Sequence, residues 1–171
     1  MIEVVIDSIR ISLVSQHRIV LLKEIDSDRQ LPIWIGPCEA DAITIELQDV
    51  KVARPLTADL VNLVTRELGG EISHVLIREL TDQVFHASLF INTGDDSREI
   101  DCRPSDAIAL AVRAKVPILV NEPVLEEAGV QPEPDLMEDV DSEETEEEVG
   151  NLDAFSDFLD TLDFEDFEGE S

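Results

Sequence analysis

Two short stretches of the chain place an arginine and a proline directly before hydroxyl and acidic side chains. They read Arg54-Pro55-Leu56-Thr57-Ala58-Asp59 and Arg103-Pro104-Ser105-Asp106. A guanidinium can hold a phosphate through two parallel hydrogen bonds, and a helix that begins beside it adds backbone N–H groups. We therefore predict two phosphate-binding corners, whose substrate-binding residues are Arg54, Arg103, Ser105 and Thr57.

Helix capping explains part of this pattern without any ligand. Pro104 is tolerated at a helix start, Ser105 can accept hydrogen bonds from free N–H groups, and Asp106 suits the positive end of the helix dipole. Thr57 is the expected N-cap at the other corner. Capping does not explain either arginine, so a purely structural role and a binding role both remain open.

Three acids near predicted helix starts are the candidate catalytic groups: Asp106, Asp59 and Glu39. Carboxylates often hold a divalent cation, which can activate water. Glu39 is a better candidate than Asp41, because residues two apart on a helix point about 200° apart. The sequence does not show that these groups meet in space.

The elements that must position these residues do not alternate regularly. Runs rich in β-branched residues predict strands over 2–13, 18–25, 31–35, 72–80, 84–92, 97–102 and 117–120. Apolar spacing and Gly/Pro signals predict helices over 39–48, from 57 to the glycine pair at 69–70, and over 105–115. This order is not that of a doubly wound sheet. We predict an α+β fold with a mixed, mostly antiparallel sheet and helices packed on it.

Charge divides the chain into a body and a tail. The net charge is −28; residues 1–120 hold all 12 Lys and Arg with 19 acids, whereas residues 121–171 hold 21 acids and no base. We predict a folded domain over 1–130 and an acidic disordered linker over 131–150, because the linker has too few apolar residues to offset its ordering entropy. Residues 151–171 regain a helical apolar spacing, which predicts an acidic amphipathic helix.

The same composition limits the possible partners. No basic cluster is visible, so strong binding to duplex nucleic acid is not expected. The tail could instead bind a basic protein or mimic nucleic acid. The chain has no apolar run long enough to span a membrane and no signal-peptide pattern at its start, and its two cysteines lack a CxxC spacing. We expect a reduced cytoplasmic protein, and the long apolar strands suggest a homo-oligomer.

Three motifs resemble the bifunctional nuclease family. They are LPIWIGPCEADAI at 31–43, RPLTADL at 54–60 and IDCRPSDAIALAVR at 100–113, and they occur in the order typical of the family. The resemblance covers about residues 1–130. It implies a nuclease that hydrolyses RNA, DNA or both. On this resemblance we expect Asp106, Asp59 and Glu39 to be its catalytic groups, and Asp106 and Glu39 to hold Mg²⁺ or Mn²⁺ as the cofactor. One departure is Ala58, where family members often have His, so any proton transfer by that His is missing here.

Two functions follow as hypotheses. The first is a nuclease that hydrolyses phosphodiester bonds of RNA or DNA with a divalent metal. The second is a non-catalytic oligomeric interaction or regulatory module, whose acidic tail engages a basic partner. The resemblance supports the first, and the charge distribution supports the second.

Overall fold

The computed structural model describes residues 1–11 and 17–131. Seven strands form one sheet in the order β3-β2-β1-β7-β4-β5-β6. Their bounds are β1 Ile2–Ile11, β2 Arg18–Glu24, β3 Gln30–Ile35, β4 Glu71–Thr81, β5 Val84–Thr93, β6 Asp96–Cys102 and β7 Ile118–Val120. Four helices accompany them: α1 Pro37–Leu47, α2 Thr57–Glu67, α3 Pro104–Ala114 and α4 Glu122–Ala128.

The sheet is mixed and mostly antiparallel, as predicted. Only the pairing of β4 with β7 is parallel, and the short strand β7 joins the N-terminal strands to the β4–β5–β6 meander. All seven predicted strands form, with ends within one or two residues where the structure describes them. The β4–β5 turn is tight because Asp82 and Gln83 both adopt positive φ, as a two-residue hairpin loop requires.

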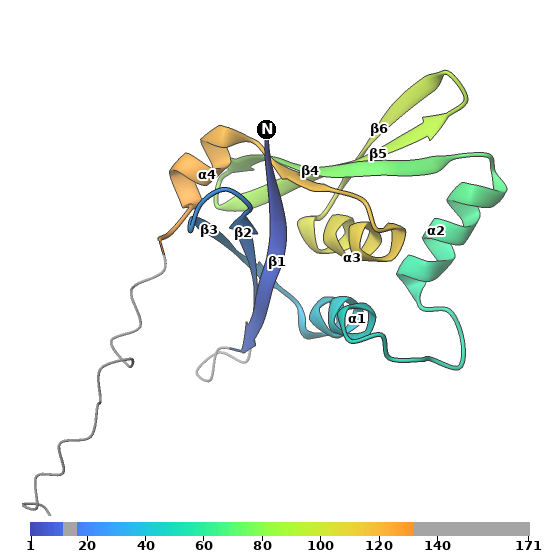
Figure 1. Cartoon of the computed structure of the whole chain (residues 1–171), viewed down its shortest axis with the longest axis horizontal. Coiled ribbons are helices and arrows are strands. Elements are labelled where there is room, and N and C mark those ends of the chain that lie inside the picture. Colours follow the sequence, from blue (N-terminus) through green and yellow to red (C-terminus); the bar gives the residue numbers. More distant parts are fainter. Residues whose placement is uncertain (12–16, 132–171) are drawn as a thin grey trace, which may run out of the picture. The chain divides into compact units, whose positions relative to one another are not determined.

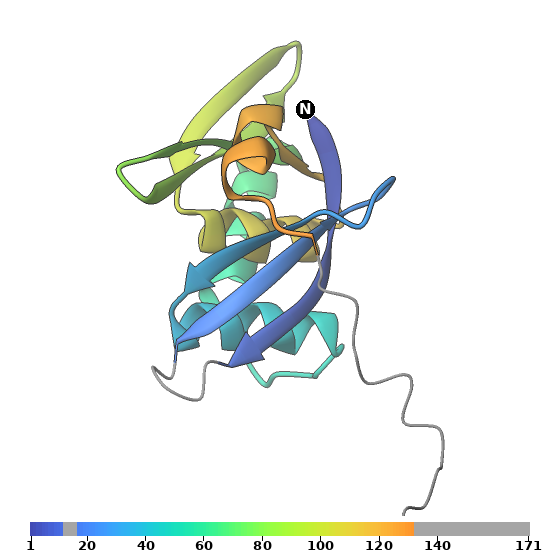
Figure 2. The ribbon, with the colours of Figure 1, turned by 90° about the vertical axis from the view of Figure 1, so that its left-hand side faces the viewer.

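Helix α3 is the central helix of the fold. It packs on β4 and β5, and both α1 and α2 contact it (Figure 1). In the turned view, strands β1, β2 and β3 lie in front of α1 and α3 (Figure 2). The core between these layers is aliphatic, and its fully buried members include Leu22, Ile43, Ile77 and Ile108. The apolar run after Pro104 is therefore explained by burial, because five of its side chains, from Ala107 to Ala111, are buried.

The helix starts differ from the sequence prediction in detail. Arg103 is the N-cap residue of α3 and Leu56 that of α2, and neither helix has a side-chain cap. Ser105 and Thr57 therefore lie inside the first turn and are not caps. Asp59 instead reaches back, and its Oδ2 accepts a hydrogen bond of 2.7 Å from the Leu56 N–H. Asp59 and Asp106 lie in the first turns of their helices, where acids are favourable. Pro104 is the first residue of α3, a position that tolerates proline, and Pro55 precedes the N-cap of α2.

Helix α4 was not predicted from the sequence. Its seven residues follow β7 directly, with Pro123 near the start, and they bury Val124 and Leu125. Residues 122–128 contain three glutamates and only a short apolar pair, so the sequence pattern does not predict a packed helix there. In the structure the helix packs against β4 and β3. The predicted linker beyond residue 131 and the predicted C-terminal helix over 151–171 lie outside the described residues. No helix in the described part of the chain is long and apolar enough to cross a membrane.

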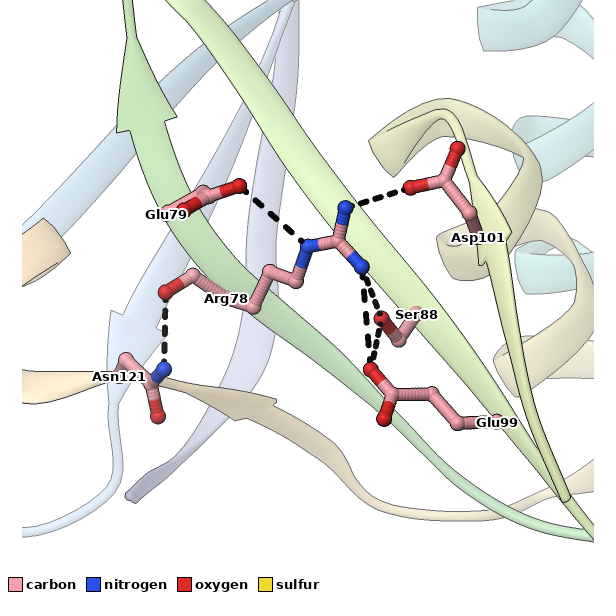
Figure 3. A network of polar contacts seen from close by, with 6 residues as sticks. All are labelled: Arg78, Glu79, Ser88, Glu99, Asp101 and Asn121. Atoms are coloured by element: carbon pink, nitrogen blue, oxygen red, sulfur yellow. Dashed lines mark hydrogen bonds and ion pairs between the residues drawn. The ribbon is translucent and has the colours of Figure 1, made fainter.

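A polar network lies on β4, β5 and β6, centred on Arg78 (Figure 3). Its guanidinium donates to Asp101 over 2.7 Å and to the Ser88 hydroxyl over 3.2 Å. The fully buried Ser88 hydroxyl in turn donates to Glu99 over 2.7 Å. Asn121 donates to the backbone carbonyl of Arg78 over 2.8 Å and so ties the end of β7 to this region. The network satisfies the buried Ser88 hydroxyl and joins the three strands of the meander.

Candidate functional site

One pocket of about 450 Å³ lies where three helices begin. Residues from the first turns of α1 and α2, and from the start of α3, line it together with apolar side chains further along each helix. The first-turn residues are Cys38, Glu39, Thr57, Ala58, Arg103, Ser105 and Asp106; the others are Ala42, Val61, Ala109 and Leu110. First-turn N–H groups have no partner within their own helix, and each helix start carries a partial positive charge. These groups favour an anion, although the pocket also holds two carboxylates, Glu39 and Asp106, against the one positive side chain of Arg103.

Arg103 is the central charge of this pocket. Its Nε and Nη2 donate to the two oxygens of Asp106 over 2.7 and 3.0 Å, and its Nη1 lies 3.0 Å from Oε1 of Glu39. The hydrogen bond to Asp106 is the main cause that raises the pKa of Arg103, followed by the charges of Asp106 and Glu39. Its side chain is 65% exposed, so the guanidinium remains open to a ligand from solvent.

Glu39 is held at its position by the backbone before it. It is the third residue of α1, and its side chain is 25% exposed. A Cβ at Gly36 would meet Oε2 of Glu39. Gly36 has φ −71° and ψ 159°, a conformation open to any residue, so a side chain there would displace the flexible end of Glu39 and would not strain the backbone. The absence of a side chain at Gly36 allows the carboxylate to fold back toward the helix start.

The first arginine–proline corner is divided between two hollows: Thr57 and Ala58 line this pocket, but Arg54 and Asp59 do not. Arg54 and Asp59 line a different hollow of about 380 Å³, which also contains Arg113. Oδ1 of Asp59 accepts a hydrogen bond of 2.6 Å from Nε of Arg113, whose side chain is only 3% exposed. Oδ2 of Asp59 accepts the hydrogen bond from the Leu56 N–H. Both oxygens of this carboxylate therefore have structural partners. The structure thus brings together five of the seven predicted site residues: Glu39, Thr57, Arg103, Ser105 and Asp106.

Sequence reasoning missed the residue that fixes the three helices around the pocket. Arg113 donates to the carbonyl of Ala42 in α1 over 2.8 Å and to that of Ala109 in its own helix over 3.0 Å, besides its bond to Asp59 in α2. The sequence feature that could have indicated this role is the arginine near the end of a helix whose other residues after Asp106 are apolar. It was also missed that Cys38 and Val61 line the pocket.

The donor atoms limit which metal chemistry the pocket could support. In the described part of the chain, no group of three or more His, Cys, Asp or Glu side chains is arranged to hold a metal ion. The pocket offers two carboxylates, Glu39 and Asp106, and Arg103 binds both. Mg²⁺ commonly uses one or two carboxylates together with substrate phosphates. These two acids fit that arrangement only when Arg103 turns from them to a phosphate.

The two cysteines are free thiols. Cys38 is exposed in the first turn of α1, whereas burial, with the negative charges of Asp106 and Asp101, raises the pKa of Cys102 to about 11. Cys102 is therefore a protonated, half-buried thiol at neutral pH.

Comparison with known proteins places this architecture in a family. Residues 20–133 match the model of the bifunctional nuclease domain. An uncharacterized protein of Mycobacterium tuberculosis is 38% identical over 165 residues, covering 96% of this chain and 97% of its own length. Bifunctional nuclease 1 of Oryza sativa subsp. indica is 32% identical over 124 residues, which are 69% of this chain and only 38% of the rice protein. Bifunctional nuclease 2 of Arabidopsis thaliana is 34% identical over 107 residues, and the match covers 32% of its length. The chain therefore belongs to the bifunctional nuclease domain family.

Proposed function

We propose that this protein hydrolyses phosphodiester bonds of RNA or DNA at the pocket between the starts of α1, α2 and α3. The observation that carries the proposal is the position of Arg103 between Glu39 and Asp106, at a pocket that three helix starts face. This combination places positive charge and a carboxylate base within reach of the same phosphate. The plant relatives, which are named as bifunctional nucleases, support the same reaction class.

Each polar residue has a distinct role in this proposal. Arg103 binds the scissile phosphate and stabilises the charge that develops on its oxygens. Glu39 takes the proton from the attacking water, and Asp106 orients the guanidinium through its two hydrogen bonds. Thr57 and Ser105 line the same pocket, and in this proposal their hydroxyls donate to phosphate oxygens.

The size and lining of the pocket suit a single nucleotide unit of a flexible strand. About 450 Å³ lies within the range of small-molecule sites. Val61, Ala109 and Leu110 supply an apolar wall, and no aromatic side chain is available there for base stacking. The acidic body offers little attraction to a long duplex. We therefore propose single-stranded RNA or DNA as the substrate.

A divalent cation is a separate part of the proposal. Mg²⁺ or Mn²⁺ would be held by Glu39 and Asp106 once Arg103 had turned from them to the phosphate, so in that case Asp106 would not orient the guanidinium. The ion would supply charge neutralisation at the phosphate when bound. Cleavage that requires added Mg²⁺ or Mn²⁺ and stops with EDTA supports this part. Cleavage that persists in EDTA would exclude a metal requirement, and the reaction would then depend on Arg103 and Glu39.

The decisive experiment is cleavage of labelled single-stranded RNA and DNA by the full chain and matched variants. Arg103→Ala and Glu39→Gln should each lower the rate by at least about 100-fold, while Arg98→Ala on β6 is the control for loss of a surface arginine. Arg54→Ala tests the second corner, and a small effect is expected because Arg54 lines another hollow. Equal residual activity in Arg103→Ala and the wild type would refute the site and point to a contaminating nuclease.

A second function, a non-catalytic interaction module, is favoured by one observation. Helix α2 exposes large apolar side chains that a monomer normally buries. In that case the acidic tail would engage a basic partner protein. A pull-down that compares the full chain with a chain ending at residue 133 tests this role, and identical partners for both would exclude the tail from it.

A further inference from the structure

Trp34 is the only tryptophan of the chain, and its indole is open to solvent. The residue is 59% exposed and lies near the end of β3, an edge strand of the sheet. Its neighbours Ile33 and Ile35 are buried in the core. Because successive side chains of a strand point to opposite faces, Trp34 projects from the other face of β3, the side turned away from α1 and α3 in Figure 2. The hydrophobic core therefore does not account for this ring.

His17 contacts the indole of Trp34 without stacking on it. The two rings are perpendicular, at 86°, and their centroids lie 6.3 Å apart. The rings of His74 and Phe90 behave differently, because they stack at 4.3 Å and 11° and cover each other's faces. An edge-to-face contact orients an aromatic ring but covers less of it than a stacked contact. Part of the indole face therefore stays available to a flat ring from solvent.

A positive charge lies in the same row of the sheet as Trp34. Ile19 in β2 is opposite Trp34, and Arg10 in β1 is opposite Ile19. Residues directly opposite one another on neighbouring strands project from the same face. Arg10 is exposed, so this face presents a guanidinium and an indole that are separated by one strand.

We propose that Trp34 and Arg10 bind single-stranded RNA or DNA, with a base stacked on the indole and a phosphate on the guanidinium. Proteins that bind single strands without sequence preference combine aromatic rings and cations in this way. Residues 1–131 have 22 acids against 12 bases, so attraction of phosphates adds little affinity over most of the body. Stacking does not depend on net charge, and it supplies most of the binding here.

This surface adjoins the candidate site along the chain. Trp34 comes two residues before Gly36, the N-cap of α1, and five residues before Glu39. Five residues of extended chain span at most about 18 Å, which is the length of a few nucleotides. None of the described residues that line the pocket is aromatic, so a strand cut there needs its bases held elsewhere. The role of Trp34 as a subsite rests on the proposed function, whereas its binding of single strands does not.

The first test measures the fluorescence of Trp34 itself. The chain has one tryptophan and no tyrosine, so emission excited at the indole band reports on this residue alone. Titration of the full chain with oligothymidylate at low salt should quench the emission saturably. An abasic strand of the same length keeps the phosphates but has no base, and it should quench far less. Equal quenching by both strands, or none by either, would overturn the proposal, as would a buried indole spectrum that no strand changes.

Variants measured by anisotropy of a labelled strand separate the two contacts. Trp34→Ala should weaken binding by at least about 5-fold, and Trp34→Phe should keep most of it. Val84→Ala, at an apolar residue on β5 that is 55% exposed, is the matched control and should bind as the wild type does. Arg10→Ala should weaken intact and abasic strands alike and lower the salt slope by about 1, whereas Arg98→Ala should not. Unchanged affinity in Trp34→Ala would refute stacking.

Cleavage kinetics distinguish failure of this inference from failure of the proposed function. Trp34→Ala should raise KM at least about 5-fold and leave kcat nearly unchanged, because the indole holds a base away from the reacting phosphate. A wild type that binds strands through Trp34 but never cuts them would refute the nuclease and keep the binding surface. A nuclease whose KM is the same in Trp34→Ala would refute the subsite and keep the reaction.

Discussion

The guanidinium of Arg113 and the carboxylate of Asp59 form an ion pair of 2.6 Å that joins α3 to α2 across 54 residues of sequence. Because the Arg113 side chain is 3% exposed and also binds the Ala42 carbonyl, this pair holds together the three helices whose first turns form the pocket. The pocket geometry therefore rests on a side chain that does not line it.

Removing one partner of this pair should destabilise the protein strongly. Asp59→Ala leaves the Arg113 charge buried without its partner, which costs about 3 kcal/mol in the free energy of unfolding. Urea denaturation measures this, with the exposed Asp41→Ala as the matched control near zero. The double variant Asp59→Ala/Arg113→Met removes the stranded charge and should recover part of the loss. An Asp59→Ala protein as stable as the control would contradict the role of this ion pair in holding the helices together.

Gly36→Ala should separate activity from stability. The new Cβ takes the space of the Glu39 carboxylate and should push it away from Arg103, so the cleavage rate falls. The backbone at Gly36 suits alanine, and the more restricted unfolded chain should keep stability equal or raise it by about 0.5 kcal/mol. Thermal unfolding and the cleavage assay measure the two effects. A rate equal to that of the wild type would show that the position of Glu39 does not matter.

Arg78→Ala should weaken the β4–β5–β6 meander. It removes the hydrogen bonds to Asp101 and to the buried Ser88, at a cost of about 1–2 kcal/mol. Glu79→Ala is the control, because this acid lies 3.6 Å from Arg78 and its side chain is 55% exposed. Its removal should change stability by less than about 0.5 kcal/mol. Amide hydrogen exchange should show faster opening of β6 in the first variant only. Unchanged protection there would assign the network no structural role.

Acid should loosen the contact between the β2–β3 turn and α4. Hydrogen bonds from Arg29 and then Ser27 lower the pKa of Glu24 from its ordinary value of 4.5. Arg29 also bonds to Glu122 in α4 over 3.2 Å. A lowered pKa in the folded state means that Glu24 stabilises the protein above pH 4.5, and that this contribution is lost as the pH falls through the folded value. Unfolding curves between pH 7 and pH 3 should therefore converge for the wild type and Glu24→Gln. Parallel curves would contradict this linkage.

The two cysteines should react at very different rates. Cys38 is exposed in the candidate pocket, whereas the pKa of Cys102 is raised to about 11, and only the thiolate reacts readily. At pH 7.5, N-ethylmaleimide should modify Cys38 first, as peptide mapping by mass spectrometry would show. A mononucleotide bound in the pocket should slow that reaction. Faster labelling of Cys102 would contradict the burial of its thiol.

The sequence determined the local elements of this protein. Proline at 37 and 104, glycine at 69 and the alternation of apolar residues mark where strands and helices begin and end, because these signals act within a few residues. The same local signals placed Arg103, Ser105 and Asp106 at one helix start. They did not reveal α4, because its apolar pair is short and lies among acids.

Only the tertiary structure decided which of these residues share a site. Arg54 and Arg103 have the same local sequence context, yet the first lines a hollow with Asp59 and Arg113, and the second contacts Glu39 from 64 residues earlier in the chain. The partner of Asp59 in α2 was likewise a distant residue, Arg113. Local patterns specify the conformation of a segment, but these pairings depend on how helices pack against one another, and sequence spacing does not encode that.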